Sequence, residues 1–408
     1  MKKFAITLAS VLIAASMLLS ACAPAVTPTA APADTAAPAA TAAPADTAAP
    51  AATVAPADTA APAATAAPAA TAAPAGTAPD CTQATVFCVG VVTDVGKVDD
   101  KSFNQSAWEG IQQTQKDGGA DWIQYIETTD SKDYAKNIAT FGDAGYKVIV
   151  TVGFNLTDPT YAAAKLYPDI KFIGIDQFLS KDKTHPDWPL ANLVGLVYNE
   201  DQSGFLVGAL ASMMSKSHKI GGVFGTDAVP PVWRYGEGYR AGAAYEDMKN
   251  GTKTAVTNVY HSDVGFDKTF SDPTWGADTA KSIIDKGADV IFGGGGKTGN
   301  GAVDEAAQLK VLAIGVDTDQ YATLPEADAY LLTSAMKPIP APLEALVKLA
   351  KAGTFPTTGL YYGAAGYAPY HDLASKVDPK IDTEMQALAK GLADGSIKTG
   401  VAPVKPAK

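Results

Sequence analysis

Charged residues stand directly after several short apolar runs of the chain: Asp94, Asp176, Asp317 and Lys337. If these runs are parallel strands of α/β domains, the four side chains gather at the carboxyl ends of the strands, where such sheets bind ligands. Carboxylates accept hydrogen bonds from vicinal hydroxyls such as those of a ribose. Any one aspartate could instead cap a helix or lie on the surface, but three at equivalent places favour a ligand site.

A run of glycines, residues 293–296, follows another apolar run. Glycine lets the backbone approach a bound molecule closely, so Gly294 and Gly295 are candidate ligand contacts. The segment 294–299 also fits the G-x-G-x-x-G pattern of dinucleotide-binding proteins. We favour contact with a sugar, because the segment lies in the second half of a chain that is predicted to be exported, where reduced nicotinamide is not available. No cofactor is expected.

Phe103 lies between two polar residues at a predicted helix start. An aromatic ring in such a place is either a platform for stacking or a hydrophobic staple that packs the end of the helix. Its neighbour Asn104 could read the edge of a bound ring or cap the helix. Ser102 and Gln105 have the spacing of a capping box, with Ser102 as the N-cap and Gln105 reaching back to it.

These residues must be positioned by an alternation of strands and helices that begins near residue 85. Most of the predicted strands are short apolar runs rather than strict alternations, which is typical of parallel sheets covered on both faces. With helices between most of them, the chain is predicted to be α/β, with two doubly wound Rossmann-like lobes in series and a hinge between them. The predicted strands are 85–93, 121–127, 147–153, 170–175, 192–198, 219–225, 254–260, 289–293, 311–316, 329–335 and 359–365.

The first residues predict export and lipid attachment. Two lysines precede an apolar run, residues 4–19, which is too short for a comfortable membrane span but typical of a signal peptide. The sequence Leu-Ser-Ala-Cys follows at residues 19–22, and a lipoprotein signal peptidase needs small residues before a cysteine. We therefore expect residues 1–21 to be removed and Cys22 to carry a lipid anchor. An ordinary secretory signal with a chance cysteine is the alternative.

Residues 22–80 are predicted to be a disordered tether rich in alanine, proline and threonine. Tandem hexamers between residues 29 and 76 carry no aromatic side chain, so they cannot bury enough apolar surface to offset the loss of chain entropy. As a flexible coil the tether would span roughly 40–45 Å. A structured repeat domain is the alternative.

The charge balance excludes some partners. A net charge of −11 and a pI near 4.8 argue against binding to nucleic acid or to an anionic membrane surface. The four histidines are scattered without the spacing of metal ligands, so no metal site is expected.

Two cysteines remain besides Cys22. Cys81 and Cys88 are seven residues apart and could close a small loop in an oxidising compartment. We expect a disulfide; two free buried thiols are the alternative.

The segment 99–110, DDKSFNQSAWEG, resembles the signature of the basic membrane protein family, the purine nucleoside receptor lipoproteins. The resemblance extends over nearly all of residues 86–340 in the family's order. Further matching segments are 167–172 (YPDIKF), 204–210 (GFLVGAL), 287–291 (GADVI) and 315–320 (GVDTDQ).

The resemblance implies a type I periplasmic-binding-protein fold whose two lobes close on a nucleoside. It also implies that Phe103 and a second aromatic residue sandwich the base, while the glycine run and the four strand-end charges hold base and ribose. The second aromatic residue falls within 270–275, where we prefer Phe270 to Trp275 because Phe270 ends a loop before a helix. The chain departs from the family's name, since it is acidic.

The resemblance thus predicts an extracytoplasmic solute-binding lipoprotein of the cell membrane that captures a nucleoside, preferably a purine, and delivers it to the permease of an ABC importer. It is expected to bind rather than to catalyse. An extracellular enzyme that acts on nucleosides and a ligand sensor of the same fold are the alternatives. The expected lobes are residues 81–198 with about 337–356, and residues 199–336 with about 357–408.

Overall fold

The computed structural model describes residues 78–405, all of which belong to one unit of the chain. The predicted signal peptide, Cys22 and nearly all of the predicted tether lie outside the described residues. Within residues 78–405, no helix has the length and apolar character needed to cross a membrane.

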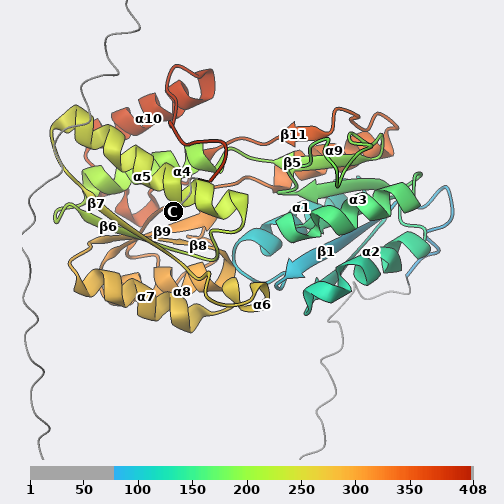
Figure 1. The fold of residues 1–408 in the computed structure, drawn as a ribbon, viewed down its shortest axis with the longest axis horizontal. Helices are drawn as coiled ribbons and strands as arrows, with labels where there is room; N and C mark the ends of the chain where they lie inside the picture. The colour runs from blue at the N-terminus through green and yellow to red at the C-terminus, as the bar shows by residue number, and fades with distance from the viewer. Residues whose placement is uncertain (1–77, 406–408) are drawn as a thin grey trace, which may run out of the picture. The chain divides into compact units, whose positions relative to one another are not determined.

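Two six-stranded sheets organise this part of the chain (Figure 1). The strands are β1 (Cys88–Val95), β2 (Trp122–Thr128), β3 (Val148–Val152), β4 (Lys171–Ile175), β5 (Leu193–Val197), β6 (Lys219–Phe224), β7 (Ala255–Tyr260), β8 (Val290–Gly294), β9 (Leu312–Asp317), β10 (Leu331–Met336), β11 (Leu360–Tyr362) and β12 (Gly366–Tyr367). The first sheet has the order β11-β5-β4-β3-β1-β2 and the second has the order β12-β10-β9-β8-β6-β7. Every pairing is parallel except that of β12 with β10.

Helices cover both faces of each sheet. In the second sheet, α4 and α5 lie on one side and α7 and α8 on the other (Figure 1). The helices are α1 (Phe103–Lys116), α2 (Tyr134–Asp143), α3 (Thr157–Leu166), α4 (Glu200–Met214), α5 (Pro230–Asn250), α6 (Phe266–Thr269), α7 (Pro273–Asp285), α8 (Gly296–Gln308), α9 (Pro340–Lys351) and α10 (Pro379–Asp394), with 3-10 turns η1 (Ser131–Asp133), η2 (Phe154–Leu156) and η3 (His371–Lys376).

The apolar strand residues explain this layering. In β1, Val89 and Val91 pack with α1 and α9, whereas Cys88 and Val92 face α2 and α3. Successive side chains of a strand point to opposite faces, so a strand covered on both sides must be apolar at every position. We call the first sheet with α1, α2, α3 and α9 the first lobe, and the second sheet with its helices the second lobe. The predicted α/β class with two doubly wound sheets is confirmed.

All but the last of the predicted strands are present, within three residues of the predicted bounds. The predicted strand 359–365 is too long: only β11, residues 360–362, forms within it, and β12 follows at residues 366–367 in the other sheet. β11 pairs with β5 of the first sheet, and β12 pairs with β10 of the second. The assignment of all of residues 357–408 to the second lobe is therefore corrected: residues 360–362 complete the first sheet.

The chain consequently passes between the lobes three times, between β5 and α4, between β10 and α9, and between β11 and β12. Ser203, in the first turn of α4, connects all three passages. Its hydroxyl donates to the carbonyl oxygen of Met336 at 2.8 Å and accepts from the backbone N–H of Gly366 at 3.1 Å. These hydrogen bonds hold the three segments together at the hinge.

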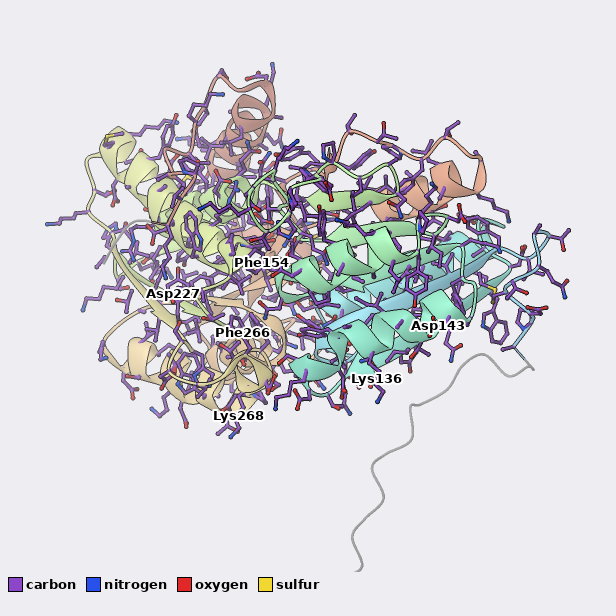
Figure 2. All side chains as sticks on the ribbon, turned by 45° about the vertical axis from the view of Figure 1, so that its right-hand side comes forward. Lys136, Asp143, Phe154, Asp227, Phe266 and Lys268 are labelled. Carbon is purple, nitrogen blue, oxygen red and sulfur yellow. A yellow bond between two sulfur atoms is a disulfide. The ribbon has the colours of Figure 1, made fainter. Side chains whose placement is uncertain are left out.

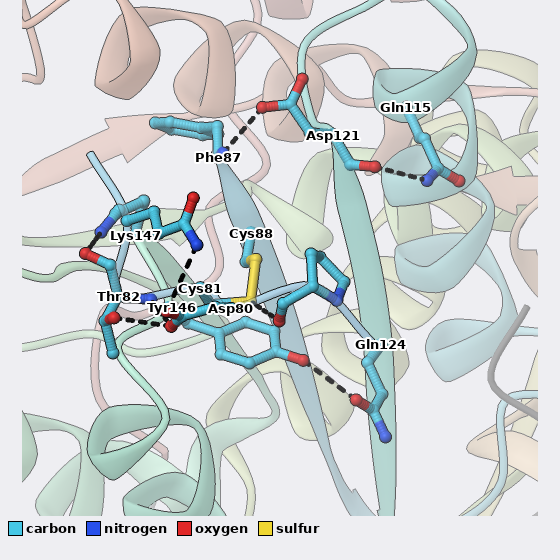
Figure 3. Close-up of a disulfide and its surroundings, with 12 residues drawn as sticks. Asp80, Cys81, Thr82, Phe87, Cys88, Gln115, Asp121, Gln124, Tyr146 and Lys147 are labelled. Atoms are coloured by element: carbon cyan, nitrogen blue, oxygen red, sulfur yellow. Dashed lines mark hydrogen bonds between the residues drawn. A yellow bond between two sulfur atoms is a disulfide. The ribbon is translucent and has the colours of Figure 1, made fainter. Parts of the chain in front are cut away.

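Cys81 and Cys88 form a disulfide (Figure 3). Both residues are buried, and Cys88 begins β1. The disulfide therefore fastens the start of the described chain to the amino end of β1, the end opposite to Asp94.

Candidate functional site

A cavity of about 290 Å³ lies at the carboxyl ends of the strands, with walls from both lobes. Its volume is at the lower end of the range typical of small-molecule sites, ~300–1,000 Å³, which suits a single metabolite. Every residue predicted to contact ligand lines this cavity: Asp94, Phe103, Asn104, Asp176, Phe270, Gly294, Gly295, Asp317 and Lys337.

Lys337 is the buried cation of the cavity. Its Nζ lies 2.5 Å from Oδ2 of Asp176 and 3.3 Å from Oε1 of Glu200. It also lies 5.1 Å from the ring centre of Phe103. Burial alone would lower the pKa of Lys337, but the carboxylates of Asp176, Glu200 and Asp317 raise it. The lysine is therefore charged and offsets part of the negative charge of these carboxylates.

Asp176 and Asp317 occupy equivalent places in the two lobes. Each comes at the end of a strand with φ in the left-handed region, 62° and 66° respectively, a conformation that aspartate adopts more readily than most residues. Asp317 accepts from the hydroxyl of Ser102 at 2.7 Å and from that of Tyr235 at 3.4 Å. Burial raises the pKa of both aspartates, and Lys337 counteracts this in each.

The start of α1 differs from the predicted capping box. The carboxylate of Asp100 accepts the backbone N–H groups of Ser102, Asn104 and Gln105 at 2.9–3.1 Å, so the Ser102 side chain does not cap the helix. Gln105 accepts from the N–H of Lys101 instead. The prediction that Ser102 caps α1 was wrong because Asp100 satisfies those donors, which leaves the Ser102 hydroxyl to reach across to Asp317.

Asn104 and Asp94 form the other polar part of the cavity. The Asn104 amide donates to Asp94 at 2.9 Å and to Asp100 at 3.1 Å, whereas its buried Oδ1 has no hydrogen-bond partner among the described residues. Oδ1 of Asp176 is a second buried acceptor without a partner in residues 78–405. An unsatisfied buried acceptor costs about 1–3 kcal/mol, so both atoms favour a ligand that brings hydrogen-bond donors.

Desolvation is the main cause that raises the pKa of Asp94, and the charges of Asp100, Asp176 and Asp317 also raise it, whereas the hydrogen bond from Asn104 lowers it. Together they bring the pKa to about 7. The Asp94 carboxylate thus binds a proton more tightly in the folded chain than in the unfolded chain. Asp94 therefore lowers the free energy of unfolding as the pH rises from about 4 to about 7. We expect Asp94→Asn to increase the free energy of unfolding by about 4 kcal/mol at pH 8 and by almost nothing at pH 4, since the pKa rises from 3.8 to about 7 and one pKa unit corresponds to about 1.4 kcal/mol. Denaturant melts at the two pH values measure this difference. A loss of stability at pH 8 would show that the Asp94 carboxylate holds the fold together.

Phe103 and Phe270 enter the cavity from opposite lobes. Phe103 begins α1, and Phe270 follows α6. A Cβ atom at Gly225 would lie 2.3 Å from the Phe270 ring, and one at Gly295 would lie 3.2 Å from it. The glycine run therefore has a role that the sequence did not predict, which is to make room for this aromatic side chain. Phe154, labelled in Figure 2, is a further aromatic residue of the lining.

Trp275, the alternative to Phe270, is not part of the lining. It stacks on the buried His261 with ring centres 4.0 Å apart. The preference for Phe270 therefore agrees with the position of the two side chains. No group of three or more histidine, cysteine, aspartate or glutamate residues within 78–405 could hold a metal ion.

The second lobe holds the loop that precedes Phe103. The side-chain amide of Asn300 donates to the carbonyl of Asp100 at 2.8 Å, and that of Gln320 donates to the carbonyl of Lys101 at 2.9 Å. Sequence reasoning missed Asn300 as a site residue. Gln320 ends one of the segments that resemble the family, which was the only signal for it.

Two lobes joined by three chain passages, with a ligand-sized cavity between them, are the architecture of the type I periplasmic-binding-protein fold. A solved solute-binding protein of an ABC transporter system from Aeropyrum pernix K1 superposes with a TM-score of 0.64 at 24% identity, over 76% of this chain and 92% of that chain. This similarity confirms the predicted fold.

A family model described as ABC transporter substrate-binding protein PnrA-like, Bmp, matches residues 87–362, and the chain belongs to this family. It is 33% identical over 342 residues to the CD4+ T-cell-stimulating antigen of Listeria monocytogenes, covering 78% of this chain and 89% of the relative. It is 30% identical over 283 residues to the ABC transporter nucleoside-binding protein BmpA of Lactococcus lactis, covering 65% and 75%. The chain is thus a solute-binding protein of an ABC transporter, and its family is not a family of enzymes.

Proposed function

We propose that the solute is a nucleoside, preferably a purine nucleoside, held between the two lobes. One observation carries this proposal: a single cavity presents aromatic rings from both lobes and, beside them, an end formed by carboxylates and a lysine. Aromatic rings suit a planar base, and the charged end suits the hydroxyls of a ribose. The name of the Lactococcus lactis relative, a nucleoside-binding protein, supports the same class of ligand.

The two polar parts of the cavity suit different parts of such a ligand. Asp176, Asp317 and Lys337 would hold the ribose hydroxyls, since a hydroxyl both donates to a carboxylate and accepts from an ammonium group. Asn104 and Asp94 would face the edge of the base, where the unpartnered Oδ1 of Asn104 accepts a ring or amino N–H. Closure of the lobes over the ligand produces the form that a permease recognises.

We further propose that Cys22 carries a lipid that holds the chain at the extracytoplasmic face of the cell membrane, where the permease of an ABC importer takes up the ligand. The support is the apolar run followed by Leu-Ser-Ala-Cys at residues 19–22. Mass spectrometry of the N-terminal peptide tests this proposal, and an unmodified Cys22 in the exported chain would contradict it.

Thermal unfolding of the purified chain with a panel of small molecules tests the ligand class. We expect purine nucleosides to raise the unfolding temperature, because a ligand at one hundred times its dissociation constant stabilises the folded chain by about 2.7 kcal/mol. Free sugars and amino acids should give no comparable shift. Stabilisation by a sugar or an amino acid, with none by any nucleoside, would replace the proposed ligand class with another.

A further inference from the structure

Glu200 is a buried carboxylate that no part of the proposed function uses. It is the first residue of α4, and it lies behind Lys337 rather than in the cavity lining. Its Oε1 is 3.3 Å from Nζ of Lys337, and its Oε2 is 3.6 Å from Nε of Arg234. A deeply buried carboxylate is unfavourable unless neighbouring cations pair with it.

Lys337 consequently has two carboxylate partners in different surroundings. Asp176 lines the cavity, at 2.5 Å from the lysine, whereas Glu200 does not line it. Lys337 pairs with Oδ2 of Asp176, and Oδ1, which has no partner among the described residues, is the atom to which a ribose hydroxyl would donate. Without another counter-ion, the ammonium group would draw on both oxygens of Asp176, because a buried cation that is poorly paired is strongly unfavourable.

We propose that Glu200 is a positioning residue for ligand binding: it is a second counter-ion of Lys337 outside the cavity lining, which leaves Oδ1 of Asp176 free to accept a hydrogen bond from a ribose hydroxyl. This inference rests on the proposed nucleoside ligand. It assigns a role in recognition to a side chain that does not touch the ligand.

Arg234 completes the arrangement. It lies on α5, pairs with Asp201 at 2.5 Å, and approaches the Glu200 oxygen that Lys337 does not, Oε2, at 3.6 Å. Burial raises the pKa of Glu200 to about 7, and Asp176 also raises it, whereas Lys337 and Arg234 lower it. Glu200 is therefore the charged counter-ion of Lys337 above that pH, and the titrations that test its role are made at pH 8.

The test measures discrimination between inosine and 2′,3′-dideoxyinosine, which lacks the 2′ and 3′ hydroxyls of the ribose and keeps the 5′ hydroxyl, by calorimetric titration. The wild-type chain should prefer inosine. Glu200→Gln should reduce the ratio of the two affinities at least fivefold, mainly by weakening the binding of inosine. Lys337 then pairs more strongly with Asp176, which is less available to the ribose hydroxyls. Glu200→Asp keeps the charge and should retain most of the ratio.

Asp201→Asn is the matched control. Asp201 is the next residue of the same helix turn and also pairs with Arg234, but it has no ion pair with Lys337. Its replacement should lower stability and leave the affinity ratio unchanged. An unchanged ratio in Glu200→Gln, or an equal fall in Asp201→Asn, would overturn the inference, because a merely structural residue weakens both ligands alike.

A double variant keeps the inference testable if Glu200→Gln is too unstable to titrate. Lys337→Met is compared with Lys337→Met/Glu200→Gln, in which the two opposite charges are removed together. If the two variants have the same ratio of inosine affinity to dideoxyinosine affinity, Glu200 acts through Lys337. A lower ratio in the double variant contradicts this. If the wild-type chain binds no nucleoside, the proposed function itself is wrong. If the wild-type chain prefers inosine to 2′,3′-dideoxyinosine and Glu200→Gln keeps the same preference, only the role of Glu200 is wrong.

Discussion

Replacement of Lys337 by methionine should lower the free energy of unfolding by about 3–5 kcal/mol at pH 8, the usual cost of removing one partner from a buried ion pair. Methionine replaces the aliphatic part of the lysine side chain but leaves Asp176, Glu200 and Asp317 without their common cation. A denaturant melt measures the change. Lys297→Met is the matched control, because Lys297 makes a more exposed ion pair with Asp99 and should contribute about 0–1 kcal/mol.

The loss in Lys337→Met should also depend on pH. Burial already raises the pKa values of the neighbouring carboxylates, and removal of the lysine raises them further. The folded variant then binds protons more tightly than the unfolded chain, so its stability increases as the pH falls. We expect a much smaller deficit at pH 5 than at pH 8. A deficit of equal size at both pH values would mean that packing, rather than charge, is what the lysine contributes.

Replacement of Phe103 by alanine should weaken nucleoside binding about five- to 150-fold, because stacking of a base on an aromatic ring contributes roughly 1–3 kcal/mol. The Phe103 ring is only partly buried against the core of the first lobe and lines the cavity. Its loss should therefore affect stability less than affinity. Calorimetric titration and a denaturant melt of the same variant give both quantities.

Phe141→Ala is the control for Phe103→Ala. Phe141 is a buried core residue of α2, and its truncation should cost about 3–5 kcal/mol of stability while leaving the affinity of the folded chain unchanged. If Phe103→Ala behaved like Phe141→Ala, with a lower unfolding midpoint and an intact affinity, Phe103 would be a packing residue.

The positions of the charged cavity residues could be predicted because a buried parallel strand must be apolar at every position. Such a strand ends visibly in the sequence, so the residue that follows it, such as Asp176 or Asp317, is placed at the ligand edge of the sheet. The short strand at residues 360–362 could not be assigned in this way. It pairs through three residues only, and nothing in its composition shows which of the two sheets it joins.

The start of α1 could not be predicted because it depends on the backbone. Lys101 has a φ of 63°, which folds the chain so that Asp100, rather than Ser102, receives three backbone N–H groups. Capping rules consider residue type and spacing, so they selected the serine. The hydroxyl that was expected to stay within its own helix crosses to Asp317 of the other lobe.

The pairing of Glu200 with Lys337 could not be predicted from the sequence, for a different reason. An acidic residue in the first turn of a helix is common, because it interacts favourably with the helix dipole. Only the fold shows that Lys337, more than one hundred residues later in the chain, lies 3.3 Å away. Contacts of this kind join two passages between the lobes, and the order of the residues along the chain does not reveal them.

Calorimetric titration of the purified chain with inosine, hypoxanthine and ribose tests the central claim most directly. If aromatic rings hold the base while Asp176, Asp317 and Lys337 hold the ribose, the nucleoside must use both parts of the cavity and each fragment only one. We therefore expect a single site per chain that binds inosine at least tenfold more tightly than either fragment. Binding of ribose as tight as that of inosine, or no binding of inosine or any other nucleoside, would contradict the proposal.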